Sequence, residues 1–175
     1  MDELSRRDLI KLGAAATLTV SLGGTESLAQ APRFFTPEEL ALVDELSDII
    51  IPSDDHSPGA RAAKVAAYID TRLAEAWDAT EKTTWREGLK VVEQVSRETS
   101  GKAFLQSAPA ERIAVVTRMA RNEAKPQNPE EVFFLQLKAR VVDAYYTSEI
   151  GIKQEMEYKG NSYLPEFVGF DVREG

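Results

Sequence analysis

Three neighbouring residues, Asp54, Asp55 and His56, form the one obvious cluster of side chains in this sequence that could do chemistry. A histidine beside carboxylates can coordinate a divalent ion or form an acid–base pair. The surrounding segment, from Ser53 to Ala60, is rich in Ser, Asp, Pro and Gly, which favour turns and helix caps. We therefore interpret it as a structural loop, with a divalent-ion site or a catalytic pair as the alternatives.

The rest of the sequence offers few groups for catalysis or cofactor binding. It has no cysteine and a single histidine, which excludes disulfides, thiolate metal sites, iron–sulfur clusters, Cys-linked haem and multi-histidine metal cages. Ser148 lies beside Glu149, but a serine nucleophile needs a base that a second histidine would have to supply. No Gly-x-Gly-x-x-Gly loop follows a strand. We expect no catalytic residue, metal site or cofactor in this chain.

The overall charge is strongly acidic. The formal net charge is -8 over 175 residues, and 43% of the residues are hydrophobic. This composition can build a core, so the chain is not a disordered tail. An acidic surface repels phosphate backbones and anionic lipid heads, which argues against nucleic-acid binding and polybasic membrane docking.

The first 29 residues have the pattern of a cleavable export signal. Arg6 and Arg7 precede a weakly apolar stretch, residues 12–22. Paired arginines before such a stretch are the twin-arginine signature, and the stretch is shorter than the ~20 apolar residues of a membrane span. We predict cleavage after Ala29, with Ala31 as a less favoured alternative, recognition by the twin-arginine translocase, and a periplasmic location.

The twin-arginine route carries proteins that have already folded, often with a cofactor loaded. Since this chain has no visible cofactor site, we predict that the cofactor sits in a partner that travels on this signal. The alternative is a cofactorless protein that uses the route because it folds fast.

Residues 30–175 are predicted to form a single all-α domain. Apolar residues recur at helical spacing, and no segment sustains a period of two. Thr36-Pro37 and Asn128-Pro129, each followed by glutamates, are helix-start signals. The pattern predicts a compact bundle of about five helices and an extended tail over residues 150–175. The expected helices span about 36–51, 60–77, 80–99, from 107 onward, and 128 to about 149.

Several aromatic residues have a predicted environment. Trp77 and Trp85 fall on apolar stripes, so we expect both in the core. Tyr145 and Tyr146 are adjacent on a helix, so one can serve the core while Tyr146 faces a partner. The tail also carries aromatic residues, which must pack on the bundle itself or on another protein. Those tail residues are Tyr158, Tyr163, Phe167 and Phe170.

Several of these segments together resemble the gluconate 2-dehydrogenase subunit 3 family, over roughly residues 34 to 169. The most specific stretch is Tyr-Tyr-Thr-Ser-x-Ile-Gly at 145–151, followed by Tyr-x-Gly-Asn at 158–161. Ile-Pro-Ser-Asp-Asp at 51–55, leading into Pro-Gly-Ala at 58–60, also matches, as does Phe35-Thr36 with the helix that follows. Where a Gly-Cys pair would be expected near the end, this chain has Gly169-Phe170, so no thiol-dependent link to a partner is available.

This resemblance implies a non-catalytic small subunit of a membrane-associated, FAD-dependent sugar or polyol dehydrogenase. Such a subunit accompanies a large FAD-binding catalytic subunit and a cytochrome subunit with haem c, and it serves maturation and export of the catalytic subunit. A free-standing periplasmic chaperone or binding module is the alternative reading, and a small periplasmic enzyme is a less favoured one. The residues predicted to face the partner are Tyr146, Ile150, Gly151, Tyr158, Gly160, Asn161, Tyr163, Pro165 and Phe167.

Overall fold

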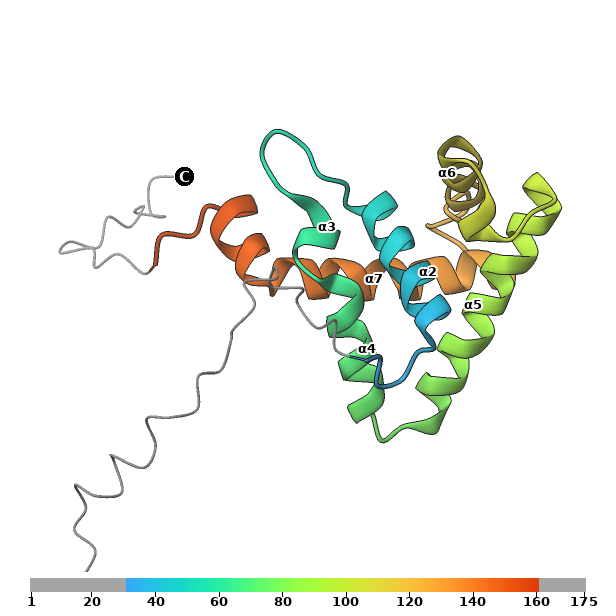
Figure 1. Cartoon of the computed structure of the whole chain (residues 1–175), viewed down its shortest axis with the longest axis horizontal. Helices are drawn as coiled ribbons and strands as arrows, with labels where there is room; N and C mark the ends of the chain where they lie inside the picture. The colour runs from blue at the N-terminus through green and yellow to red at the C-terminus, as the bar shows by residue number, and fades with distance from the viewer. Residues whose placement is uncertain (1–30, 161–175) are drawn as a thin grey trace, which may run out of the picture. The chain divides into compact units, whose positions relative to one another are not determined.

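A computed structural model of the protein describes residues 31–160. Within this range the chain is all-helical and contains no strand, as the sequence predicted (Figure 1). Five helices have more than ten residues, and a four-residue helix, α3, lies between the first two. The long helices are α2 (Pro37–Ile50), α4 (Val65–Glu75), α5 (Ala79–Ser100), α6 (Pro109–Met119) and α7 (Pro129–Tyr146).

Both predicted cap signals start helices in the structure. The Thr36 hydroxyl accepts a hydrogen bond from the backbone N–H of Glu39, and the Glu39 carboxylate accepts one from the backbone N–H of Thr36. This reciprocal capping box satisfies two backbone donors that α2 leaves open. At α7, Asn128 is the N-cap residue and Pro129 lies in the first helical turn. The end of α2 before Pro52 is also as predicted, because the helix stops at Ile50.

The prediction of one continuous helix over 60–77 is wrong, because the structure has two helices there and the second ends before residue 77. The structure divides it into α3 (Gly59–Ala62) and α4, separated at Lys64, whose φ of 56° is left-handed. Helix α4 then ends at Glu75, before the last position of the expected stripe. Trp77 therefore lies in the corner between α4 and α5, where its side chain is 99% exposed. The prediction of a core position holds for Trp85 and is wrong for Trp77.

The second half of the domain follows the predicted order. Helix α5 ends at Gly101, whose φ of 74° terminates the helix, and a short 3-10 turn (Phe104–Gln106) leads into α6. On α6, Val116 and Met119 are buried as their helical spacing predicts, and so is Val115, whereas Ile113 at the start of the same pattern is exposed. A pattern of so few apolar residues fits two neighbouring helix faces, and packing selects between them.

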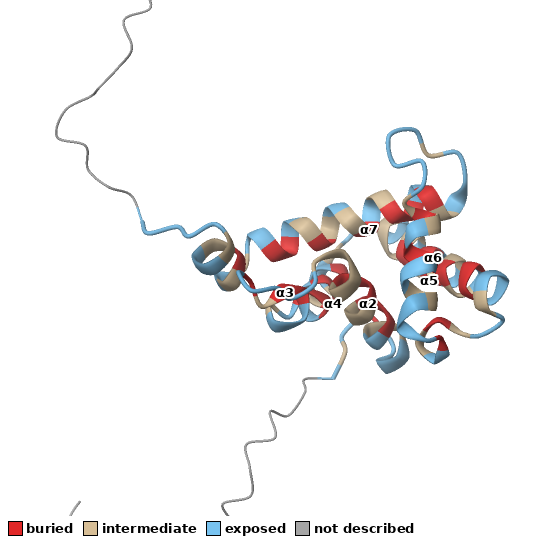
Figure 2. Ribbon diagram, turned by 90° about the horizontal axis from the view of Figure 1, so that it is seen from above, coloured by how far each residue is buried: buried red, intermediate tan, exposed pale blue. Residues whose placement is uncertain are grey.

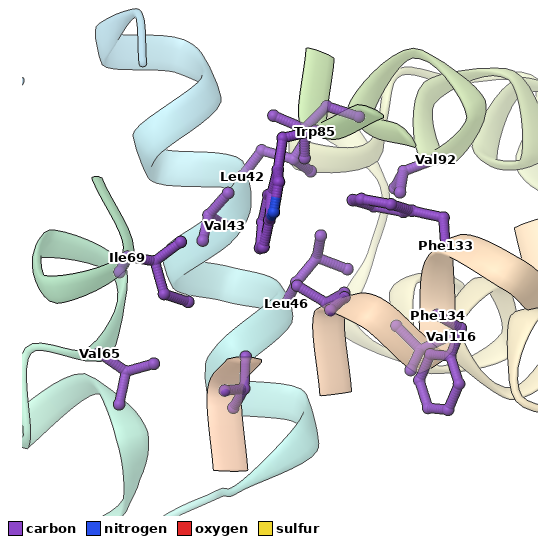
Figure 3. Close-up of a cluster of buried hydrophobic side chains, with 14 of the residues drawn as sticks. Leu42, Val43, Leu46, Val65, Ile69, Trp85, Val92, Val116, Phe133 and Phe134 are labelled. Carbon is purple, nitrogen blue, oxygen red and sulfur yellow. The ribbon is translucent and has the colours of Figure 1, made fainter. Parts of the chain in front are cut away.

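The core forms where α2, α4, α5 and α7 meet. Figure 2 shows buried residues recurring along these helices, and Figure 3 shows their side chains converging between the ribbons. Trp85 lies between Phe35 and Phe133, with ring centroids 5.9 and 5.6 Å away. Gly88 on α5 lies directly beneath the ring of Phe133 on α7, so a Cβ there would overlap the ring. This glycine lets α5 and α7 approach closely.

The expected extended tail begins differently from the prediction. Residues Gly151–Glu155 form one turn of π-helix, closed by the Met156 N–H donating to the Gly151 carbonyl at 2.9 Å. Residues 156–160 have no regular structure, in agreement with the prediction. The signal residues Arg6, Arg7 and Ala29 and the tail residues Asn161, Tyr163, Pro165, Phe167 and Phe170 lie outside the described residues.

None of the helices in residues 31–160 is both long and apolar enough to cross a membrane.

Candidate functional site

The two segments that carry most of the family resemblance are brought together at one end of the bundle. Ser57 lies in the loop between α2 and α3, and Tyr145 lies at the end of α7. Their hydroxyl groups hydrogen-bond to each other in the interior, although 88 residues separate them in the chain. Both side chains are buried, so this polar pair fastens the loop to the last turn of α7.

The loop is shaped by hydrogen bonds within itself. The Asp54 carboxylate accepts the backbone N–H groups of Ser57 and His56 at 2.7 and 2.8 Å. The Asp54 N–H in turn donates to the Ser57 carbonyl at 2.8 Å. These bonds, that from Ser57 first, hold the pKa of Asp54 below its ordinary value of 3.8. The carboxylate is therefore used to build a turn, the role favoured for it from the sequence.

Gly59 closes the loop. Its φ of 74° is left-handed, and a Cβ there would meet the backbone of Pro52 and Ser53 at 2.6 to 2.9 Å. The Ala60 N–H then donates to the Ile51 carbonyl at 2.9 Å. Only glycine fits both the dihedral angle and the space, which gives a physical reason for the Pro-Gly-Ala sequence at this point.

His56 links the loop to the C-terminal segment. Its Nε2 atom donates to the backbone carbonyl of Glu155 at 3.2 Å. In the part of the chain that the structure describes, no group of three or more His, Asp or Glu side chains is placed to hold a metal ion.

Ser148 and Glu149 also have structural contacts. The Ser148 hydroxyl donates to the Tyr145 carbonyl at 2.6 Å and accepts the Gly151 N–H at 3.0 Å. Glu149 pairs with Lys153 one turn later at 2.7 Å. Gly151 is required because a Cβ there would overlap the carbonyl oxygen of Tyr145. Ser148 and Gly151 thus turn the chain out of α7 and into the π-helical turn.

Tyr145 and Tyr146 point in different directions, as predicted. Tyr145 is fully buried, whereas Tyr146 is 38% exposed and its phenol donates to the Glu155 carboxylate at 3.5 Å. The two rings lie edge to face, with centroids 5.3 Å apart. Partial desolvation and the neighbouring Glu155 carboxylate raise the pKa of Tyr146 above its ordinary value, so this phenol stays protonated and keeps its hydrogen bond to Glu155.

Three large aromatic or apolar side chains are exposed beside this junction, among charged residues. Tyr146, Met156 and Tyr158 are all exposed, and His56 lies on the adjoining loop. We call these four residues the C-terminal surface. Of the residues predicted to face a partner, Gly160 is also exposed, whereas Ile150 is half-buried and Gly151 is buried. The last two support this surface from beneath.

Sequence reasoning missed two buried carboxylates. Asp70 on α4 accepts the backbone N–H groups of Arg33, Phe34 and Phe35 at 2.7, 2.9 and 2.8 Å. Glu131 on α7 accepts those of Gln127 and Asn128. The sequence gives no signal for the burial of Asp70, because an acid that directly follows a stripe residue such as Ile69 points to a different side of the helix and is common on solvated faces.

Comparison with known proteins gives one match. The model of the gluconate 2-dehydrogenase subunit 3 family matches residues 37–165, and searches of curated proteins and of solved structures returned no match. The matched range contains α2 to α7, the Ser57 loop and the C-terminal surface. By sequence, and with both motif segments meeting at one end of an all-helical fold, this chain belongs to the gluconate 2-dehydrogenase subunit 3 family.

Proposed function

We propose that this chain is a non-catalytic accessory subunit of a periplasmic, FAD-dependent dehydrogenase that oxidises a sugar or polyol. It binds the large catalytic subunit through the C-terminal surface and is needed for maturation and twin-arginine export of that subunit. FAD belongs to the catalytic subunit and haem c to a cytochrome subunit that connects the complex to the membrane.

The observation that carries this proposal is the junction of Ser57 with Tyr145. The buried pair fixes two distant segments as one rigid unit, and Tyr146, Met156 and Tyr158 remain exposed on its outer side. Aromatic residues and Met are enriched at protein interfaces, and a preorganised surface loses little entropy on binding. The residues of the family motifs therefore support an exposed surface. The polar groups among them form hydrogen bonds within that support.

The side-chain inventory agrees with an accessory role. The Asp54 carboxylate and the Ser148 hydroxyl are both engaged by backbone groups, and His56 contacts a backbone carbonyl. A chain without cysteine whose single histidine binds backbone has little means to hold a redox centre. An electron-carrying partner supplies what this chain lacks.

Co-expression with a large FAD-binding catalytic subunit of the gluconate 2-dehydrogenase type tests the proposal. The expected result is a yellow complex that keeps one copy of this chain per catalytic chain after purification, while the isolated chain shows no turnover of sugars with an artificial electron acceptor. A substoichiometric amount would favour a free-standing chaperone. Turnover by the isolated chain, or a prosthetic group bound to it, would overturn the proposal.

Export is tested separately with the double variant Arg6→Lys, Arg7→Lys. We expect both this chain and the flavoprotein to remain in the cytoplasm, because under this proposal the flavoprotein is exported only with the signal of this chain. A matched control changes Lys11→Arg, which keeps the charge and the arginine pair. Normal delivery of the flavoprotein to the periplasm in the double variant would contradict the piggyback route while leaving the subunit assignment intact.

A further inference from the structure

We infer that the outer side of α4 and the corner after it form a second contact surface for the same catalytic subunit. This surface, here called the α4 ridge, consists of Tyr68, Arg72 and Trp77. The inference rests on the proposed function and adds to it the region that a partner must cover beyond the C-terminal surface.

Trp77 provides the first observation. At 99% exposure it is the most solvent-accessible large hydrophobic residue in the described part of the chain. Burial of a large aromatic side chain is strongly favourable, so the full exposure of this indole leaves a gain available to a partner. Trp is also among the residues most enriched at the energetic centres of interfaces.

The corner that carries Trp77 is held rigidly. The Ala76 N–H donates to the Arg72 carbonyl at 2.9 Å, and Asp78 caps α5 by accepting the Thr80 N–H at 2.8 Å. Lys82 reaches across the corner and donates to the Ala74 carbonyl at 3.2 Å. The indole is therefore presented from a fixed backbone, which reduces the entropy lost when a partner covers it.

The rest of the α4 ridge has a matching composition. Tyr68, 41% exposed, and Arg72 lie one turn apart on the outer side of α4, because residues i and i+4 share a helix face. In residues 31–160 the Arg72 guanidinium forms no ion pair or side-chain hydrogen bond. Tyr, Arg and Trp are the three residue types most enriched in binding hot spots, and here Tyr68 and Arg72 lie on α4 while Trp77 lies in the corner directly after it.

A hollow adjoins the α4 ridge. Its volume is about 300 Å³, and it is lined by Arg72, Glu75, Trp77, Asp78, Glu81 and Arg140. Its polar lining suits a side chain of the partner that enters beside the indole. The partner surface that fits is an apolar cleft for the indole, with an acceptor for its N–H and a carboxylate facing Arg72.

The area needed for a lasting contact favours one partner that covers both surfaces. A stable interface covers ~800 Å² and about 20–30 residues on each partner. The four residues of the C-terminal surface fall far short of that number, so a partner that binds there must extend onto a neighbouring face. Helix α4 packs against α7, which carries Tyr146, so one large partner can reach both surfaces.

The test uses the complex of this chain with the co-expressed flavoprotein and compares Trp77→Ala with Ile113→Ala. Ile113 is also an exposed apolar residue, but it lies on α6. We expect at least tenfold weaker binding for Trp77→Ala and less than a twofold change for Ile113→Ala. Thermal unfolding of the isolated variants should match the wild type, because neither side chain is buried. Equal binding by the two variants would overturn the inference.

A second readout follows the indole directly. Incorporation of 5-fluorotryptophan into this chain gives two fluorine signals, one from Trp77 and one from Trp85. The solvent-isotope shift of the Trp77 signal should disappear in the complex, and its persistence would overturn the inference. If the wild-type chain retains no flavoprotein at all, the proposed function fails and this inference fails with it. If the wild-type complex forms and Trp77 stays in solvent, only the α4 ridge is excluded.

Discussion

The phenol of Tyr145 and the hydroxyl of Ser57 meet inside the bundle, and this contact joins the loop rich in Asp, Ser and Pro between α2 and α3 to the last turn of α7. Each group is the hydrogen-bond partner that the other needs once water is excluded. The two segments that carry most of the family resemblance therefore meet at this contact.

Removal of one hydroxyl should show how much this contact contributes. Tyr145→Phe leaves the Ser57 hydroxyl buried without its partner, which should lower the free energy of unfolding by about 1–2 kcal/mol. Tyr146→Phe, the matched control, removes an exposed hydroxyl and should change stability by less than about 0.5 kcal/mol. Urea denaturation of both variants measures the difference, and equal midpoints would refute a stabilising role for the buried pair.

The close approach of α5 and α7 depends on Gly88. Gly88→Ala places a methyl group where the Phe133 ring lies, so we expect destabilisation of about 1–3 kcal/mol despite the better helix propensity of alanine. Adding Phe133→Leu frees space and should recover part of the loss relative to Phe133→Leu alone. Thermal unfolding of the double-mutant cycle tests this coupling, and additive effects would contradict it.

Acid stability should depend on Glu131. Hydrogen bonds from the N–H of Gln127, and then from Asn128 and Asn122, hold the pKa of Glu131 below 4.5, although burial opposes them. A lowered pKa means that the unfolded chain takes up the proton first, so the stabilisation exists above about pH 4.5 and is lost as the pH falls through the folded-state pKa.

The Glu131→Gln variant tests this direction of the pH dependence of stability. It should be less stable than the wild type at neutral pH, and its melting temperature should fall less steeply between about pH 5 and pH 3. Glu87→Gln, which changes an exposed carboxylate, should follow the wild-type curve. A Glu131→Gln curve parallel to that of the wild type would show that this carboxylate does not contribute to acid unfolding.

The C-terminal surface should bind the catalytic subunit through Tyr146. Tyr146→Ala should weaken the complex by about tenfold or more, because truncation of an aromatic anchor costs 2 kcal/mol or more at an interface centre. Val132→Ala, at an exposed position in the first turn of α7, is the control and should bind normally. Binding is measured by titration of the flavoprotein, and unchanged affinity of Tyr146→Ala would argue against this surface.

Local chemistry made much of the fold predictable. The capping box at Thr36, the Asn128-Pro129 start and the Gly101 stop depend on a few adjacent residues, so the sequence shows them directly. The division between Tyr145 and Tyr146 was predictable for the same reason, since adjacent helical positions cannot share a face.

Other features depend on packing between distant segments and could not be read locally. Lys64 adopts a left-handed φ without glycine or asparagine to signal it, so the break between α3 and α4 was missed. Trp77 continued an apolar stripe that ends with the helix at Glu75, and periodicity alone does not show where a helix stops. The Ser57–Tyr145 pair likewise appears only when the chain is folded.

The three backbone N–H groups of Arg33 to Phe35 that bind Asp70 also have a mechanical consequence. A pull on the chain from the N-terminal side of Arg33 reaches this carboxylate before it reaches Pro37, the first residue of α2. Force is thereby diverted sideways into α4, and α2 is shielded from being peeled off turn by turn. In single-molecule stretching, loss of this carboxylate in Asp70→Ala should let α2 unravel at lower force.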